Sequence, residues 1–207
     1  MGCCGVRGVA RVARQMEIFQ KHQSLLSEKR QLADQLETVL RDGTTDPAQT
    51  AERVKSIIAG GETDQAEFKS TLRINLKTGN ADKGVEKAWI KTIVAFLNSS
   101  GGVLLVGVED DGNILGTAAD QFENEDKCLL HVNNKIKQYI GLESAGFIRY
   151  RLVALGDREV LYVECRPSPS PVFVHLGKDE EFYIRVGPGS RQLSTSEVLK
   201  YVSNRSI

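Results

Sequence analysis

The stretch FLNSSGGVLLVGVEDDG, residues 96–112, decides the fold because it joins a helix end, a strand and a turn. NSSGG, residues 98–102, ends a helix, since consecutive glycines stop helical structure. VLLVGV, residues 103–108, is a continuous apolar run, which is typical of a central strand buried on both faces. EDDG then has the composition of a tight turn. We therefore expect a sheet with helices packed against it.

The flanking sequence extends this pattern in both directions. Helices are predicted over residues 84–98 and 120–140 from their apolar periodicity. FIRYRLVAL and EVLYVECR, joined by GDR, read as a hairpin, and VFVHL and FYIRVG read as two more strands. Ser194 and Glu197 form a capping box at the start of a last helix. The order of the elements predicts an α+β fold, with a mixed β-sheet and packed helices.

The N-terminal part has a different pattern of apolar residues. Residues 16–41 read as one long helix in which Ile18, Leu25, Leu32 and Val39 recur every seven residues. This spacing predicts either a coiled coil or a helix packed on its own domain. A second helix starts near Pro47 and ends at two glycines. We therefore divide the chain into a helical segment, 1–61, and a domain, 62–207.

AEFKSTLRIN, residues 66–75, alternates apolar and polar residues and predicts one half-buried strand. Its polar face would carry Glu67, Lys69 and Arg73 together. Such a face can serve solubility and cross-strand pairing alone. It can also gather a carboxylate and two cations at a binding site.

Composition excludes several classes of protein. The chain has 207 residues and no formal net charge, so a nucleic-acid surface would have to be local. The four cysteines form no CxxC pair, so we expect neither zinc nor a disulfide framework. There is no apolar run of membrane-spanning length, no signal-peptide core and no GxxxxGK[ST] loop. We expect a cytoplasmic protein without a membrane partner.

Three stretches together, ETDQAEFK, FLNSSGGVLLVGVEDDG and FYIRVGPGSRQLSTSE, resemble the AlbA-like domain of the Schlafen family. The resemblance covers residues 62 to about 204. It implies nucleic-acid binding, to RNA or DNA, and in some members a metal-dependent endoribonuclease that cleaves structured RNA. An older family label as a divergent AAA domain implies ATP binding, but the phosphate-binding loop is missing here.

The resemblance also implies a catalytic and metal-binding set. Carried over by position, the acids are Glu62, Glu67 and Asp110, with Asp111 as an adjacent alternative and Glu109 where the family often has Asp. Carboxylate oxygens are the ligands that Mg²⁺ and Mn²⁺ prefer, and such a metal activates water at a phosphate. The implied cofactor is therefore Mg²⁺ or Mn²⁺.

Basic side chains are the candidate phosphate contacts. Some follow the first strand of the domain, where lysines four residues apart share a helix face, and others lie around the glycines of YIRVGPGSRQ. The candidate nucleic-acid-binding residues are Lys69, Arg73, Lys77, Lys83, Lys87, Arg185 and Arg191.

Three functions stay open at this point: a metal-dependent ribonuclease, a nucleic-acid-binding module without catalysis, and an interaction adaptor that uses its helical segment. Animal Schlafens place two copies of the domain in one chain, around a positively charged valley. Only one copy is present here, so we expect a homodimer in which residues 16–41 of the two chains associate.

Overall fold

The computed structural model describes residues 21–22, 25, 29, 47–177 and 179–204. The chain divides into two compact units, Met1–Asp46 and Pro47–Ile207. The few described residues of the first unit are helical. Most of the predicted helix over 16–41, and the coiled coil proposed for it, lies outside the described residues.

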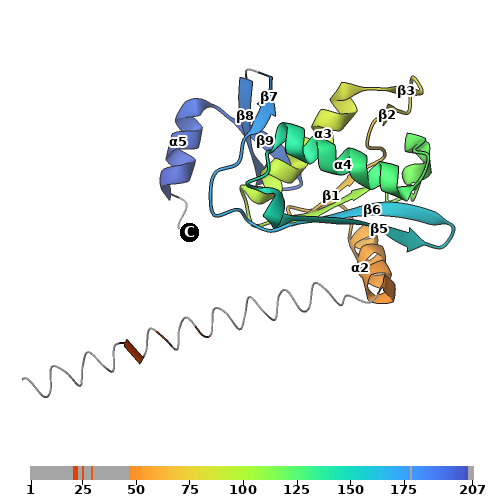
Figure 1. Cartoon of the computed structure of the whole chain (residues 1–207), viewed down its shortest axis with the longest axis horizontal. Helices are drawn as coiled ribbons and strands as arrows, with labels where there is room; N and C mark the ends of the chain where they lie inside the picture. The colour runs from red at the N-terminus through yellow and green to blue at the C-terminus, as the bar shows by residue number, and fades with distance from the viewer. Residues whose placement is uncertain (1–20, 23–24, 26–28, 30–46, 178, 205–207) are drawn as a thin grey trace, which may run out of the picture. The chain divides into compact units, whose positions relative to one another are not determined.

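The second unit contains all the sheets found in the described ranges (Figure 1). Its elements in chain order are α2 (Pro47–Gly60), β1 (Ala66–Lys69), β2 (Ile74–Asn75), β3 (Asn80–Ala81), α3 (Lys83–Leu97), β4 (Gly102–Val106), the 3₁₀ turn η1 (Thr117–Asp120), α4 (Glu125–Tyr139), the 3₁₀ turn η2 (Ala145–Phe147), β5 (Ile148–Leu155), β6 (Arg158–Cys165), β7 (Val174–Leu176), β8 (Asp179–Val186), β9 (Gly189–Leu193) and α5 (Thr195–Asn204).

The main sheet has the strand order β1-β4-β6-β5. Strands β1 and β4 pair in parallel, while β4–β6 and β5–β6 are antiparallel, so the sheet is mixed. The predicted α+β class and the predicted β5–β6 hairpin are confirmed. The apolar run of β4 occupies an interior position, and Val103 to Val106 are buried, as expected for a strand covered on both faces.

Each face of this sheet has its own core. Helices α3 and α4 cover one face, where Trp89 and Phe96 pack with Leu104 and Val163. Helix α2 lies against the other face, as Figure 1 shows, and inserts Val54 among side chains such as Phe68 and Leu105. Within the described ranges, no helix combines the length and apolarity needed to cross a membrane.

Helix α2 belongs to the folded domain rather than to the preceding segment. Val54 is fully buried, and the boundary between the two compact units falls at Asp46, before the helix. The domain boundary expected after Gly61 is therefore corrected. The apolar side of this helix is needed to cover a sheet face that would otherwise be exposed to water.

The predicted strand over 66–75 is wrong in its length. It breaks after Lys69, and Ile74 belongs to the separate β2–β3 hairpin. The cause is Asp120, whose carboxylate accepts hydrogen bonds from the backbone N–H groups of Leu72, Arg73 and Ile74. Those N–H groups are thereby withdrawn from strand pairing.

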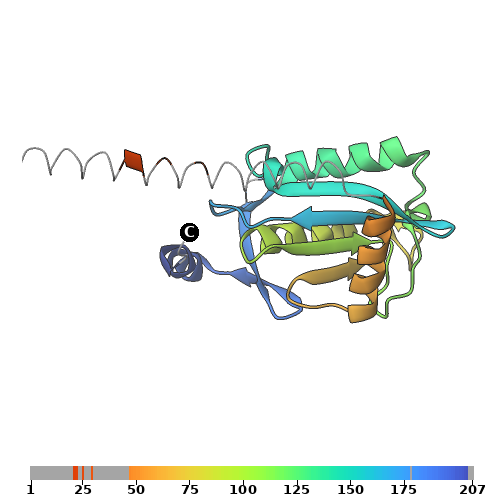
Figure 2. The ribbon, with the colours of Figure 1, turned by 90° about the horizontal axis from the view of Figure 1, so that it is seen from below.

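Two smaller differences concern the C-terminal half. The helix expected from residue 120 starts at Glu125, because Asn124 caps it by accepting the Lys127 N–H. Residues 189–193, for which no strand was predicted, form β9 and pair with β8 (Figure 2). The last helix starts as predicted, since the Glu197 carboxylate accepts the Ser194 N–H and Oγ–H.

Candidate nucleic-acid interface

Strand β1 places Glu67 and Lys69 on one face of the sheet. In the register with β4, Glu67 lies opposite Leu104 and Lys69 opposite Val106, while Phe68 points to the α2 side. The Lys69 Nζ donates to Glu67 Oε1 at 2.6 Å and also to the Phe68 carbonyl. The acid and the base of the EFK motif are therefore partners of each other.

A second cation, Arg185 of β8, reaches the same carboxylate. Its Nη1 lies 2.8 Å from Glu67 Oε2, and its Nη2 and Nε donate to the carbonyls of Thr63 and Asp64. The guanidinium also stacks 4.8 Å from the centroid of the Phe96 ring. Its side chain is only 3% exposed. In this conformation Arg185 joins β8 to the loop before β1. Its guanidinium is not accessible to an external phosphate.

The other two predicted acids have separate roles. Glu62 Oε1 accepts the backbone N–H of Phe68 at 2.9 Å. Asp110 is exposed in the turn after β4, where its neighbours Glu109 and Asp111 accept hydrogen bonds from Asn113. Among residues 47–177 and 179–204, no group of three or more Asp, Glu, His or Cys side chains is placed to bind a metal ion.

The residues therefore do not fit a shared divalent cation. A metal ligand needs free carboxylate oxygens, but both Glu67 oxygens are engaged by ammonium or guanidinium groups. A divalent cation at Glu67 would also lie next to two positive charges. The predicted metal set of Glu62, Glu67 and Asp110 stays a prediction that this conformation does not support.

Arg73, expected beside Glu67, contributes to a different cluster. Its Nε donates to the Asp120 carbonyl and its Nη2 to the Gln121 carbonyl, and the guanidinium lies 4.2 Å from the centroid of the Phe122 ring. The break after β1 carries Arg73 away from the Glu67 face. This side chain holds the 70–74 segment against η1.

Three of the predicted phosphate contacts lie in the β2–β3 hairpin and in the first turns of α3, which follows it in the chain. Lys77 and Lys83 are exposed and Lys87 is half-buried, and in the described part of the chain no acidic group lies within 4 Å of their ammonium groups. We call these three residues the lysine surface. Arg191, by contrast, is paired with Glu197.

Glu86, in the first turn of α3, does not pair with the three lysines of the lysine surface. It is buried and turned toward α4, where its carboxylate lies 2.7 Å from Lys135 Nζ and 3.3 Å from His131 Nε2. Sequence reasoning missed this cluster. The signal was the i, i+4 spacing of His131 and Lys135, which puts both on one face of a helix.

The NSSGG segment connects the helix end to the C-terminal strands. The Asn98 Nδ2 donates to the carbonyls of Val172 and Tyr183, and its Oδ1 accepts the Val172 N–H. Ser99 Oγ accepts the Arg185 N–H. A Cβ on Gly102 would lie 2.4 Å from the Phe96 ring. The three motifs that suggested the family therefore meet in one structural junction.

The residues that form this junction lie within a stretch that matches a known protein family. The family model described as Schlafen, AlbA_2 matches residues 62–194. No curated protein matches the chain.

Two solved structures resemble the fold. The DIP2311 protein from Corynebacterium diphtheriae has a TM-score of 0.52 and 19% identity, and the match covers 74% of this chain but 28% of that one. The N-terminal domain of a protein described as ATP-dependent DNA helicase RecG-related, from Nitrosomonas europaea, has a TM-score of 0.43 and 16% identity, over 69% of this chain and 88% of that one. The likeness to the DIP2311 protein, at 19% identity, shows a shared fold alone.

Proposed function

This chain belongs to the Schlafen AlbA_2 family, and from that membership we propose that it binds nucleic acid through the lysine surface of Lys77, Lys83 and Lys87. The match of the family model over residues 62–194 carries the proposal. The structure contributes the choice of residues, because it separates cations that are already paired from cations that are open to a phosphate.

The lysine surface has the chemistry of a phosphate-contacting site. Lysine ammonium groups act as point charges on flexible stems and bind phosphates with little base specificity. Lys77 lies at the tip of the β2–β3 hairpin, and Lys83 and Lys87 lie one turn apart on α3. Glu86 points inward and takes no charge from this surface, while Asp82 and Glu181 are its nearest acidic neighbours. We propose RNA or DNA backbone as the ligand class.

Salt-dependent binding tests this proposal. The affinity of the whole chain for a fluorescent RNA hairpin and for a DNA duplex is measured by anisotropy over a range of salt concentrations. The triple variant Lys77→Gln, Lys83→Gln, Lys87→Gln should weaken binding and reduce the slope of log K against log salt by about 2–3, since each lost phosphate contact removes about 0.9.

A charge-matched control separates a local site from general attraction. The triple variant Lys55→Gln, Lys137→Gln, Lys200→Gln removes the same charge from α2, α4 and α5. It should keep the wild-type slope. If both triple variants lose the same affinity, binding is not localised at the lysine surface. If neither nucleic acid binds at low salt, the proposed function is wrong.

The sequence also predicted a more specific activity, that of a Mg²⁺- or Mn²⁺-dependent endoribonuclease. We propose binding without cleavage, since Glu67 is occupied by Lys69 and Arg185. The test is incubation of the RNA hairpin with the wild-type chain and Asp110→Asn in the presence of Mn²⁺. We expect the hairpin to stay intact with both proteins. Cleavage by the wild type that is lost in Asp110→Asn would restore the nuclease assignment.

A homodimer formed through residues 16–41 is also part of the proposal, since a second copy would double the phosphate-contacting surface. Its support is the heptad spacing of Leu25 and Leu32. Light scattering of the full chain should give a dimer mass, and Leu25→Glu with Leu32→Glu should give a monomer. A monomer mass for the unsubstituted chain contradicts this part.

A further inference from the structure

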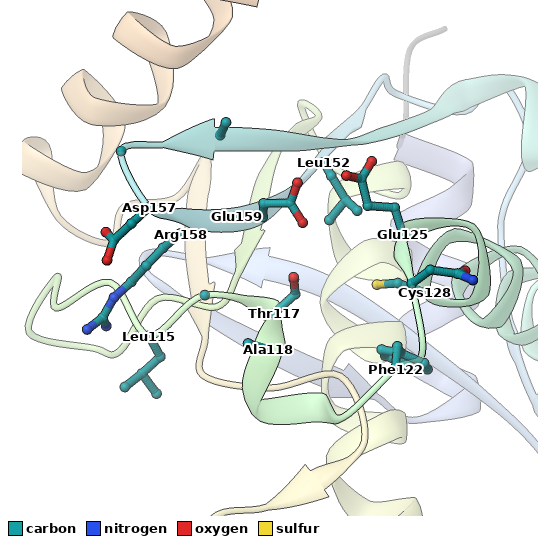
Figure 3. A pocket seen from close by; sticks show the side chains of 14 residues that line it. Leu115, Thr117, Ala118, Phe122, Glu125, Cys128, Leu152, Asp157, Arg158 and Glu159 are labelled. Carbon is teal, nitrogen blue, oxygen red and sulfur yellow. The ribbon is translucent and has the colours of Figure 1, made fainter.

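A cavity of about 610 Å³ lies beside the β5–β6 turn. It is enclosed by the loop that leads into η1, by the first turn of α4 and by the facing ends of β5 and β6 (Figure 3). This volume falls in the range of small-molecule sites. None of the residues discussed above as phosphate contacts lines it.

Two carboxyl groups face each other in this cavity. Glu125 comes from the start of α4 and Glu159 from β6, and Figure 3 shows their side chains pointing toward one another. Burial, and a hydrogen bond that the protonated Glu159 donates to Glu125, raise the pKa of Glu159. The negative charge of Glu125 acts in the same direction. A ligand with positively charged N–H groups would relieve this repulsion between the two carboxylates.

Thr117 adds a polar group to this cavity, independently of the two carboxyl groups. The residue is 8% exposed, and no hydrogen-bond partner for its hydroxyl is present among the residues that the structure describes. Figure 3 shows this hydroxyl directed into the cavity. Most of the residue is buried, and the cavity is the direction from which a molecule can reach its hydroxyl. The Thr117 hydroxyl therefore has an open position for a donor or acceptor on a bound molecule.

The other residues that line the cavity restrict which ligands it can bind. The Cys128 thiol faces the same space, and burial raises its pKa to about 11, so it is protonated and behaves as an apolar wall. Phe122 and Leu152 are further apolar walls. Arg158 points out of the cavity and donates to the Ile114 carbonyl. The interior is therefore acidic and apolar, which repels phosphates.

We propose that this cavity binds a small organic cation that presents at least two N–H donors on an apolar body, such as an amidine or a primary amine. The donors would bind the Glu125–Glu159 pair, and the apolar body would pack against Phe122 and Leu152. A metal ion fits less well, since among the described residues no three Asp, Glu, His or Cys side chains are placed to hold one. This site is independent of nucleic-acid binding.

Benzamidine is the probe for this proposal, because its amidinium group offers paired N–H donors on a phenyl ring. Binding to the full chain is measured by chemical-shift changes and calorimetry near neutral pH. We expect a Kd of about 1 mM or tighter, and benzamide, which is neutral, should bind at least about tenfold more weakly. Glu159→Gln and Glu125→Gln should each weaken benzamidine binding by about tenfold.

Two controls keep the result interpretable. Glu143→Gln removes an exposed carboxylate outside the cavity and should leave binding unchanged. Ala154→Phe keeps both carboxyl groups but adds a ring next to Glu159, its partner in the β5–β6 register, and should abolish binding by filling the cavity even if a Glu variant folds poorly. The proposal is overturned if benzamidine does not bind, if benzamide binds equally well, or if Ala154→Phe leaves benzamidine binding intact.

Discussion

The Glu67 carboxylate and the Arg185 guanidinium, 118 positions apart in the chain, form a buried ion pair with an Nη1–Oε2 distance of 2.8 Å. The pair joins the strand that carries the EFK motif to the strand that carries the YIRVG motif. Residues that suggested a catalytic acid and a phosphate-binding base therefore neutralise each other. Their first role is to hold two parts of the domain together.

Breaking this pair should destabilise the domain strongly. Arg185→Met leaves a buried carboxylate with one cationic partner, and we expect the free energy of unfolding to fall by about 3–5 kcal/mol. Arg191→Met, which removes an exposed pair with Glu197, is the control and should cost less than about 1 kcal/mol. Urea denaturation measures both values. Similar losses in the two variants would contradict a structural role for the buried pair.

The Asp120 carboxylate organises the segment that follows β1. It is fully buried and accepts three backbone N–H groups, so Asp120→Asn leaves at least one buried donor without a good acceptor. We expect a loss of about 1–3 kcal/mol, seen by denaturant unfolding. Asp111→Asn, in an exposed turn, should change stability much less. Equal stability of wild type and Asp120→Asn would show that the segment is fixed by other contacts.

Stability should fall in mildly acidic solution because of His131. Burial lowers the pKa of this histidine below 6.5, and the nearby Lys135 and Arg73 act in the same direction, against the attraction of Glu86 and Asp120. The unfolded chain then binds a proton that the folded chain resists. This contribution to stability is complete above about pH 6.5 and is lost as the pH falls through the lowered pKa.

The pH dependence of His131→Gln measures this contribution. Thermal unfolding between neutral and mildly acidic pH should show a smaller decrease for His131→Gln than for the wild type. His175→Gln, at an exposed site, should follow the wild-type profile. A wild-type stability that rises as the solution is acidified would reverse the assigned direction.

Gly102 should not tolerate a side chain. A Cβ there would lie 2.4 Å from the Phe96 ring and 2.8 Å from the Gln65 carbonyl oxygen, and the backbone φ is +158°. Gly102→Ala should lower the free energy of unfolding by at least about 2 kcal/mol. Gly60→Ala has open space around it and should be neutral or stabilising by up to about 1 kcal/mol. Calorimetry or urea unfolding compares the two variants, and an unaffected Gly102→Ala would contradict the packing described.

Local sequence signals were sufficient for most elements. The apolar run of β4, the helix that ends at Asn98 and the β5–β6 hairpin could be predicted because each is specified by its own side-chain pattern and turn residues. The Ser194–Glu197 capping box was readable for the same reason, since both partners lie within one helical turn.

The break after β1 could not be predicted from the local pattern. Residues 66–75 alternate apolar and polar side chains as a strand does, but Asp120 captures the backbone of residues 72–74 from 46 to 48 positions away. Strand β9 was missed because its pairing with β8 outweighs the loop-like composition of GPGS. In both cases a long-range contact overrides local propensity.

The sequence by itself determined the family, the α+β class and the residue types available for binding, because these follow from motifs and periodicity along the chain. Only the tertiary structure decided which charges are open to a ligand. Arg73, Arg185 and Glu86 are engaged within the domain, while Lys77 and Lys83 stay exposed. The physical reason is that a charge is neutralised by whatever group the fold brings within a few ångströms, and that neighbour is usually far away in sequence.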